Sequence, residues 1–351
     1  MVAATVQTAS LVSPVQDPYG RATTDLRISV TKRCNLACFY CHNEGQDLAA
    51  TDINAAEIAT VVRAATACGV TAVKLTGGEP LIRKDIVEIV AAVAPLVPEV
   101  SMTTNGVLLP RYARGLADAG LRRLNLSLDT PEAVRFQGVT GHDLMDQVLA
   151  GIAAAKAAGL QRLKVNMVVM RDVNHDQIEE MLAFCARHEV LLQLIEIHTD
   201  RHGLSTDLYQ RYFYDLGPLE DRFARRAIEM RERAFHRRKV YTLPAPGGGR
   251  VDVEVVRPMH NPTFCGACTR IRLTADGLLK PCLFVDHGLV DVLGPIHNGA
   301  SDAQVRALVE QLIASRVPYW MPHNIPAADD PASSLRVLSP IATATAAQER
   351  P

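Results

Sequence analysis

The stretch that decides the fold is Cys34-Asn-Leu-Ala-Cys38-Phe-Tyr-Cys41, which follows the apolar segment 26–30. Three thiolates with C-x3-C-x2-C spacing on one loop can hold three corners of a [4Fe–4S] cube. The fourth iron then stays open, and an open coordination position separates reactive metal sites from structural ones. Taken alone, the spacing is equally compatible with a zinc knuckle or with unrelated cysteines, so the surrounding chain has to decide.

Short apolar segments alternate with amphipathic ones around this loop. The predicted strands are 26–30, 72–75, 100–104, 123–128, 163–169 and 191–197, and the predicted helices are 54–68, 84–96, 110–119, 143–158 and 176–187. Such alternation is typical of a parallel sheet with helical crossovers. The strands are apolar almost throughout, which predicts that both faces are covered. Right-handed crossovers of this kind form either a barrel or an open doubly wound sheet.

Polar motifs come directly after the predicted strands. Cys34 follows the first strand, Gly77-Gly78-Glu79-Pro80 the second, Asn105 the third and Asp129 the fourth. In both candidate architectures the carboxyl ends of the strands form the functional edge. Glycine has no Cβ, so the backbone at residues 77–78 can approach a ligand closely.

The pattern changes after residue 200. Segment 201–239 is rich in charged and aromatic residues and is predicted to be helical. Pro-Ala-Pro-Gly-Gly-Gly at 244–249 predicts a break, and 251–256 alternates as a strand. After residue 324, Pro, Ala, Ser and Thr dominate, which is typical of a disordered tail.

A second group of cysteines, Cys265, Cys268 and Cys282, has C-x2-C-x13-C spacing. With His260 or His287 as a fourth ligand it would form a structural zinc site, whereas three cysteines alone again leave an iron open.

Arg270 and Arg272 occupy alternate positions of a predicted strand just after Cys268, so their side chains point the same way. Two guanidinium groups aimed at one place suit a phosphate or carboxylate. A solvated strand face is the alternative.

Composition narrows the class of protein. The 351 residues are 48% apolar and 21% charged, with a net charge of −1, which gives no argument for nucleic acid or a membrane surface as partner. The N-terminal segment lacks a secretory signal, and no apolar run is long enough to span a membrane, so a cytoplasmic protein is expected. In such a chain, clustered cysteines indicate metal binding rather than disulfides. The two isolated cysteines, Cys68 and Cys185, are predicted to be buried and inert.

Together these motifs resemble the radical SAM superfamily, in which C-x3-C-x2-C follows the first barrel strand and the open iron chelates S-adenosylmethionine (SAM). The resemblance implies a partial (βα)6 TIM-like barrel in which Cys34, Cys38 and Cys41 hold a [4Fe–4S] cluster. It also implies SAM contacts at Tyr40, Gly78, Glu79 and Ser127. Glu79 is expected to accept from the methionine ammonium, and Ser127 to face the ribose or carboxylate.

The C-terminal motif resembles the GTP 3',8-cyclase family of molybdenum-cofactor biosynthesis, and the resemblance extends over about residues 17–325. It implies a second [4Fe–4S] cluster on Cys265, Cys268 and Cys282, whose free iron contacts the guanine. The implied GTP contacts are Arg27, Lys74, Thr103, Lys164, Arg270 and Arg272.

The implied reaction begins when the first cluster reduces SAM, which gives a 5'-deoxyadenosyl radical. This radical takes a hydrogen from C3' of GTP, and C3' then bonds to guanine C8 to give 3',8-cyclo-7,8-dihydro-GTP. An external one-electron reductant and cyclic pyranopterin monophosphate synthase, as the downstream enzyme, are the implied partners.

Some residues depart from the bacterial members of this family. Their sixth strand reads L-R-F-I-E, and Gln193 stands in place of the arginine, which implies the loss of one phosphate contact. The sequence ends in Gln-Glu-Arg-Pro rather than in two glycines. Segments 41–45 and 255–261 resemble the archaeal-type branch instead. The basic run 222–239 could be a lid that supplies charge to a triphosphate, but a solvated helix is expected for most of it, with 236–239 left open.

The predicted organisation is an N-terminal extension (1–20), a barrel core (21–243), a second-cluster domain (244–326) and a disordered tail (327–351). Two other functions stay open: a radical SAM enzyme of the same architecture that acts on another nucleotide or a peptide, and a non-catalytic zinc or iron–sulfur protein. The Gly-Gly-Glu-Pro run argues against the second. The sequence does not decide whether the protein forms a homodimer.

Overall fold

The computed structural model describes residues 12–45, 52–160, 162–233, 237–320 and 337–338. Six strands follow the order of the chain, and each pairs in parallel with the next. They are β1 (Asp25–Ser29), β2 (Ala72–Thr76), β3 (Glu99–Thr104), β4 (Arg123–Ser127), β5 (Arg162–Val169) and β6 (Leu191–Glu196). The predicted parallel sheet is confirmed, and no strand end differs from its prediction by more than one residue.

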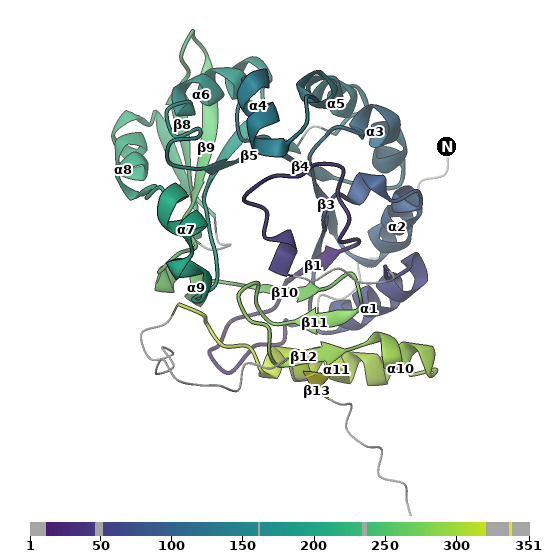
Figure 1. Ribbon diagram of the computed structural model, residues 1–351. Helices are drawn as coiled ribbons and strands as arrows, with labels where there is room; N and C mark the ends of the chain where they lie inside the picture. Colours follow the sequence, from purple (N-terminus) through teal and green to yellow (C-terminus); the bar gives the residue numbers. More distant parts are fainter. Residues whose placement is uncertain (1–11, 46–51, 161, 234–236, 321–336, 339–351) are drawn as a thin grey trace, which may run out of the picture.

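Helices cover the outside of this curved sheet, as Figure 1 shows. They are α1 (Ala55–Ala67), α2 (Ile86–Val93), α3 (Leu109–Asp118), α4 (Ala133–Thr140), α5 (Met145–Ala157) and α6 (Ile178–Arg187), with short 3-10 turns η1 (Asn43–Gly45), η2 (Pro80–Ile82) and η3 (Ala94–Leu96). Among these elements α4, η1 and η2 were not predicted. A capping box begins α1: the Asn54 side chain accepts from the backbone of Ala56 and Glu57, and Glu57 accepts from the Asn54 backbone. Such a cap stabilises a helix by about 1 kcal/mol.

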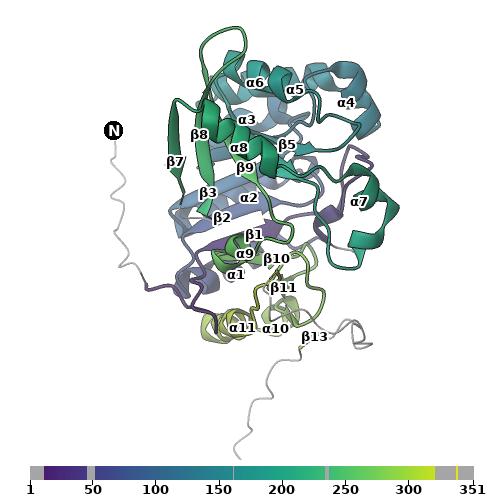
Figure 2. The ribbon, with the colours of Figure 1, turned by 90° about the vertical axis from the view of Figure 1, so that its left-hand side faces the viewer.

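The C-terminal part of the chain extends the sheet at both edges. Strand β10 (Arg270–Leu273) pairs in parallel with β1, and β9 (Arg250–Val256) pairs in parallel with β6. The complete order is β13-β12-β11-β10-β1-β2-β3-β4-β5-β6-β9-β8-β7. Its remaining strands are β7 (Glu229–Glu232), β8 (Lys239–Pro244), β11 (Leu278–Lys280), β12 (Leu289–Asp291) and β13 (Val337–Leu338). The partial barrel is therefore continued by later segments beside both its first and its sixth strand (Figures 1 and 2).

Further helices accompany these edges. On one side lie η4 (Gly203–Ser205), α7 (Asp207–Tyr212) and α8 (Gly217–Arg226), and on the other, beside β12, lie α10 (Leu293–His297) and α11 (Asp302–Ala314). The short helix α9 (Pro262–Gly266) precedes β10 in the chain. Helix α11 packs against α1. None of the helices in the described ranges is long and apolar enough to cross a membrane.

The basic run 222–239 is the predicted solvated helix only over residues 222–226, and residues 234–236 lie outside the described residues. Helix α8 ends at Arg226, and the chain continues as β7, which pairs antiparallel with β8. The sequence of β7, Glu-Met-Arg-Glu, has no strong strand preference of its own, so pairing with the alternating strand β8 decides its conformation. The predicted break at 244–249 is confirmed as the β8–β9 turn, where Gly247, Gly248 and Gly249 all have positive φ.

The predicted domain division stays a prediction. Its boundary at 243/244 falls inside β8, where the sheet is continuous. Within the extension 1–20, the Val15 backbone donates to the Cys68 carbonyl (2.9 Å). Of the predicted tail 327–351, Val337–Leu338 form β13 beside β12, and the rest lies outside the described residues.

The two faces of the barrel strands differ, although the sequence predicted that both are apolar. Outward residues such as Leu26, Val73 and Leu124 are fully buried beneath the helices. Inward residues such as Lys74 and Asn125 are polar and line a cavity. This arrangement follows from the strand periodicity of two, since neighbouring residues point to opposite faces.

Candidate functional site

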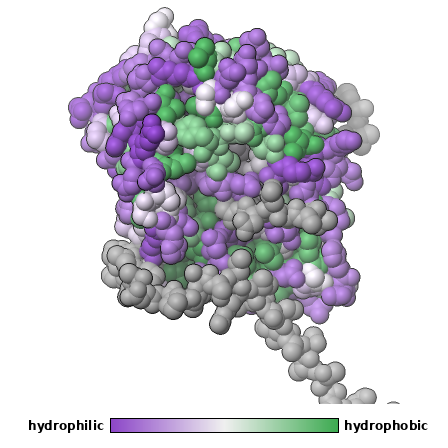
Figure 3. Space-filling model, in the orientation of Figure 1, coloured by the Kyte–Doolittle hydropathy of each residue, from purple (hydrophilic) through white to green (hydrophobic). Residues whose placement is uncertain are grey.

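The barrel encloses a cavity of about 790 Å³, within the range of roughly 300–1,000 Å³ that is common for ligand pockets. Most of the predicted site residues line it: Arg27, Tyr40, Lys74, Thr103, Ser127, Lys164, Cys265, Cys268, Arg270, Arg272 and Cys282. Figure 3 shows the molecule in the orientation of Figure 1. Hydrophilic residues cover much of this face, and apolar residues gather near its centre.

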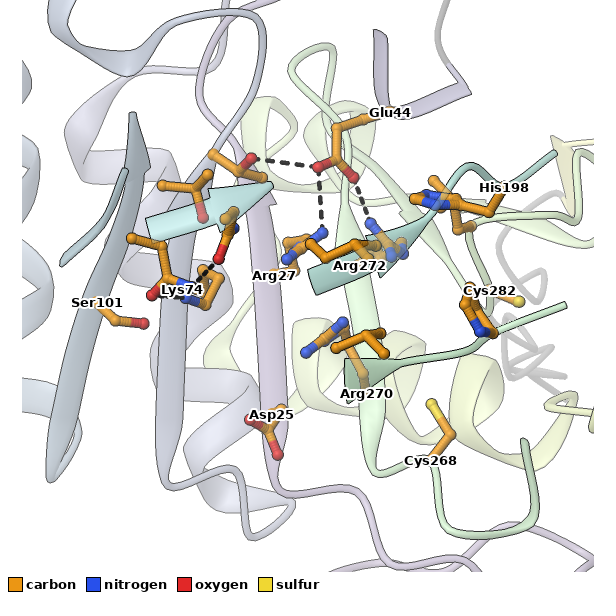
Figure 4. Close-up of a pocket in the computed structure, with 18 of the residues that line it drawn as sticks. Asp25, Arg27, Glu44, Lys74, Ser101, His198, Cys268, Arg270, Arg272 and Cys282 are labelled. Atoms are coloured by element: carbon orange, nitrogen blue, oxygen red, sulfur yellow. Dashed lines mark hydrogen bonds and ion pairs between the residues drawn. The ribbon is translucent and has the colours of Figure 1, made fainter. Parts of the chain in front are cut away.

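Cations dominate one wall of this cavity. Arg270 and Arg272 on β10 both point inward beside Arg27 on β1, which confirms that the two β10 arginines face the same way (Figure 4). Burial lowers the pKa of Arg27 to about 9, and Arg270 and Arg272 add to that shift while Glu44 opposes it. Burial and neighbouring cations also hold the pKa of Lys74 well below its usual range. An anionic ligand would relieve this mutual repulsion.

Glu44, to which the sequence analysis gave no role, lies between two of these arginines. Its Oε1 lies 3.2 Å from Arg27 Nη1 and accepts from Thr76 Oγ1 (3.2 Å), while Oε2 accepts from Arg272 Nη1. Burial favours the neutral acid, but the two arginines outweigh it and hold the pKa of Glu44 well below its usual range. The residue has a left-handed φ of 54°. The Glu44 carboxylate is therefore paired with two arginines, Arg27 and Arg272, that were predicted to bind substrate.

The loop with the first three cysteines presents backbone donors to sulfur. The Leu36 amide donates to Cys34 Sγ (3.4 Å), and the Asn43 amide donates to Cys41 Sγ (3.4 Å). Such bonds favour thiolate ligands and tune iron–sulfur clusters. Burial, with a contribution from Asp129, raises the pKa of the Cys38 thiol to about 12, so a bound cation would have to supply the charge that stabilises the thiolate. These donors fit a [4Fe–4S] cluster.

The glycines of the second motif pack against this loop rather than line the cavity. Gly78 N donates to Thr31 O (2.8 Å), and Glu79 N donates to Arg33 O (2.8 Å). A Cβ on Gly78 would lie 2.1 Å from Arg33 O, closer than atoms can approach. Residues 77–78 are thus glycine because two backbones touch where the cysteine loop begins.

Glu79 is buried and fully hydrogen-bonded within the protein. It accepts from Thr104 Oγ1 (2.7 Å) and from the backbone of Asn105 (2.7 Å) and Leu81 (2.9 Å). Burial raises its pKa to about 7. Neither Glu79 nor Gly78 lines the cavity, so their SAM contacts stay predictions. Tyr40 does line it, and its hydroxyl donates to Asp129 Oδ2 (2.5 Å).

The second cysteine loop is fixed by a buried ionic network that the sequence analysis missed. Arg316 Nη2 donates to Cys268 O (2.7 Å), and Arg21 Nη1 donates to Cys265 O (3.0 Å). Asp17 pairs with both arginines, at 2.7 Å from Arg21 Nε and 3.3 Å from Arg316 Nη1. Two residues just before β1 thereby position a loop some 250 residues later in the sequence.

The zinc alternative for this loop names His260 or His287 as the fourth ligand. No three His, Cys, Asp or Glu side chains among the described residues are grouped to hold one metal ion. His260 instead packs on the Trp320 ring, with centroids 4.3 Å apart. In a cubane each thiolate binds its own iron, so Cys265, Cys268 and Cys282 need not converge on one point.

At the opposite end of the cavity, a buried carboxylate collects three cations. Glu254 on β9 lies 2.8 Å from Lys164 Nζ, 2.5 Å from Arg233 Nε and 3.4 Å from Arg238 Nη1. Burial, partly offset by Glu254, lowers the pKa of Lys164 to about 8. Arg233, Arg238 and Glu254 were not predicted as site residues. The alternation of charged and apolar residues along β9 is the sequence feature that could have indicated Glu254 as a site residue.

Comparison with known proteins gives two family matches. Residues 28–185 match the Radical SAM superfamily, and residues 190–322 match Molybdenum Cofactor Synthesis C. A curated relative from Pyrococcus abyssi, named "Probable GTP 3',8-cyclase", is 48% identical over 87% of this chain and 99% of its own length. A relative of the same name from Methanothermobacter thermautotrophicus is 41% identical over 88% of this chain and 99% of its own length.

Among solved structures, Streptococcus suis SuiB bound to its precursor peptide SuiA superposes with a TM-score of 0.57 at 18% identity. The match covers 76% of this chain, and this chain spans only 61% of SuiB. SuiB bound to S-adenosylmethionine gives a TM-score of 0.53 at 18% identity, over 75% of this chain and 60% of that chain. At such low identity the likeness supports the partial barrel fold and nothing finer.

Proposed function

The chain belongs to the GTP 3',8-cyclase family of radical SAM enzymes, and on this premise we propose that it converts GTP to (8S)-3',8-cyclo-7,8-dihydro-GTP, the first step of molybdenum cofactor biosynthesis. The observation that carries the proposal is the cationic wall formed by Arg27, Arg270 and Arg272, which lies beside Cys268 and Cys282 (Figure 4). A protein of net charge −1 can bind an anionic nucleotide at such a wall because the positive charge is local.

Cys34, Cys38 and Cys41 are the residues that would hold the [4Fe–4S] cluster of the radical SAM family. Bound there together with SAM, the cluster supplies a 5'-deoxyadenosyl radical, which is the chemistry that side chains cannot provide. The chain has to exclude water and hold C3' of the ribose within reach of that radical. Ser127 and Tyr40 line the cavity near the carboxyl ends of the strands and are proposed to orient SAM.

The substrate contacts follow from the lining of the cavity. Thr103 Oγ1 is buried without a hydrogen-bond partner in the described part of the chain, so a ligand can satisfy it. Lys74 Nζ donates to the neutral Asn125 Oδ1 (3.2 Å), and a bound anion would favour the charged form of this lysine. We propose that these groups, with Lys164 and the three arginines of the cationic wall, bind GTP.

A second [4Fe–4S] cluster on Cys265, Cys268 and Cys282 is part of the proposal. Cys268 and Cys282 lie beside Arg270 and Arg272, so a ligand held by the arginines would be next to a free iron (Figure 4). The pathway partners are proposals too: an external one-electron reductant, and cyclic pyranopterin monophosphate synthase as the enzyme that takes the product.

The experiment is to reconstitute the protein anaerobically and incubate it with SAM, dithionite and GTP. The proposal expects 5'-deoxyadenosine and a cyclised dihydro-GTP to accumulate together. SAM cleavage with unchanged GTP would leave a radical SAM enzyme with another substrate, and absence of SAM cleavage in the iron-loaded protein would contradict the assignment altogether.

A further inference from the structure

We infer that the β7–β8 hairpin supplies, through Arg233 and Arg238, two cations that bind the polyphosphate end of the nucleotide. The inference rests on the proposed function, because it takes GTP as the occupant of the cavity. It concerns residues outside the barrel strands and outside the cysteine motifs.

The first observation is the position of Gln193. It lies on β6, lines the cavity and is 8% exposed. Its Oε1 accepts from Arg238 Nη1 (3.3 Å). A guanidinium from the β7–β8 hairpin thus reaches position 193.

The second observation is how the hairpin holds both arginines. Arg233 N donates to Arg238 O (2.7 Å), which fixes the two residues opposite each other just beyond the β7–β8 pairing. Both side chains line the cavity. Glu254, which is fully buried, pairs with each of them from the adjacent strand β9. Glu254 therefore aims the guanidinium groups and is a positioning residue.

The third observation is the local balance of charge. Lys164 is the third cation on Glu254, so the group of these four residues carries two more positive than negative charges. The field of Arg123, which Glu99 pairs with (2.8 Å), also lowers the pKa of Arg238, whereas Asp25 opposes that shift. A multiply charged anion is the ligand that such a group of cations favours.

The direction of the nucleotide follows from the fold. The loop of Cys34 follows the carboxyl end of β1, so the reacting sugar has to lie near the carboxyl ends of the strands. Lys164 and Gln193 lie near the amino ends of β5 and β6. A triphosphate that extends away from the reacting centre therefore points toward Arg233 and Arg238.

The test compares the binding of GTP and GMP to anaerobically reconstituted protein with SAM and without reductant. Losing one charge-assisted contact should raise the dissociation constant of GTP roughly 10- to 100-fold in Arg238→Ala. We expect a smaller rise in Arg233→Ala, because that side chain is 41% exposed. GMP, which lacks the two outer phosphates, should bind both variants within about twofold of the wild type.

A matched control lies on the same hairpin. Arg231 pairs with Asp252 of β9 (2.5 Å), as Arg233 pairs with Glu254, but it does not line the cavity. Arg231→Ala should bind GTP like the wild type. Gln193→Arg, added to Arg238→Ala, should restore much of the lost affinity, because it places a guanidinium at the same point from β6.

The outcomes separate the two proposals. If the wild type neither binds nor cyclises GTP, the proposed function fails and this inference fails with it. If the wild type cyclises GTP but Arg233→Ala and Arg238→Ala keep its ratio of GTP to GMP affinity, the inference alone is overturned. Equal losses of GTP and GMP affinity would also overturn it, since they would indicate a general disturbance of the barrel.

Discussion

Glu44 Oε1 lies 3.2 Å from Arg27 Nη1, so a carboxylate three residues beyond Cys41 is bound to an arginine of the cationic wall. The same carboxylate accepts from Arg272 on β10. The loop of the first cysteine group is thus joined through one side chain to β1 and β10. A phosphate or other anion that binds these arginines has to compete with Glu44.

Replacing Glu44 should raise the affinity for GTP and lower the stability of the unliganded protein. Glu44→Gln removes the competing charge, so GTP should bind several-fold more tightly. The unliganded protein should lose about 1–3 kcal/mol of unfolding free energy, because Arg27 and Arg272 lose a charged partner. Thermal unfolding with and without GTP, together with equilibrium binding, measures both effects. Weaker GTP binding at unchanged stability would show that Glu44 does not compete with the ligand.

Gly78→Ala should disrupt the first cysteine loop. The added methyl would lie 2.1 Å from Arg33 O, so the backbone on one side has to move. We expect less iron bound after reconstitution and a lower unfolding midpoint. Gly138→Ala is the matched control, since it is an exposed position of α4 with nothing within 4 Å of the new methyl. That change should be neutral or stabilise the helix by up to about 1 kcal/mol. Normal iron content in Gly78→Ala would refute this account of the glycines.

GTP affinity should decline as pH rises through about 8. Burial lowers the pKa of Lys164 to about 8 from its usual 10.5, so its ammonium is mostly charged at pH 7 and mostly neutral at pH 9. Only the charged form of this lysine attracts a phosphate. Binding measured from pH 7 to 9 should show the decline in the wild type. Lys164→Met should bind more weakly with a flatter profile, and an equally steep profile in that variant would assign the titration elsewhere.

Arg316→Met should weaken the second cysteine loop selectively. The change removes the bond to Cys268 O and leaves Asp17 paired with Arg21 alone. We expect about four irons per chain instead of about eight, with SAM cleavage by the first cluster retained. Arg306→Ala is the control, because Arg306 pairs with Glu310 on the surface of α11, and such pairs contribute little. Full iron content in Arg316→Met would argue against the network as a support of this loop.

The sequence predicted the barrel well because its strands and helices each show a clear hydrophobic periodicity. Period-two and helical segments gave each of the six strands within one residue, and the cysteines with the Gly-Gly-Glu-Pro run indicated the family. Cys68 and Cys185 are fully buried, as predicted. The prediction of a helix for 222–239 was wrong beyond Arg226, because β7 forms only when β8 is present to pair with it.

The residues that were missed are those whose partners lie far away in the sequence. Arg316 meets Thr23, and Arg238 meets Gln193, only after the sheet is assembled. Treating the strands as apolar on both faces also concealed the cavity. In β5 the alternation of Lys164 and Asn166 with apolar neighbours predicts one polar face, which the structure turns inward.

The central claim is that this cavity directs a radical to C3' of GTP. The most direct measurement uses GTP with deuterium at C3', incubated anaerobically with the reconstituted protein, SAM and dithionite. The account predicts that the deuterium appears in 5'-deoxyadenosine, in step with a cyclised dihydro-GTP. Unlabelled 5'-deoxyadenosine with GTP recovered intact would contradict it.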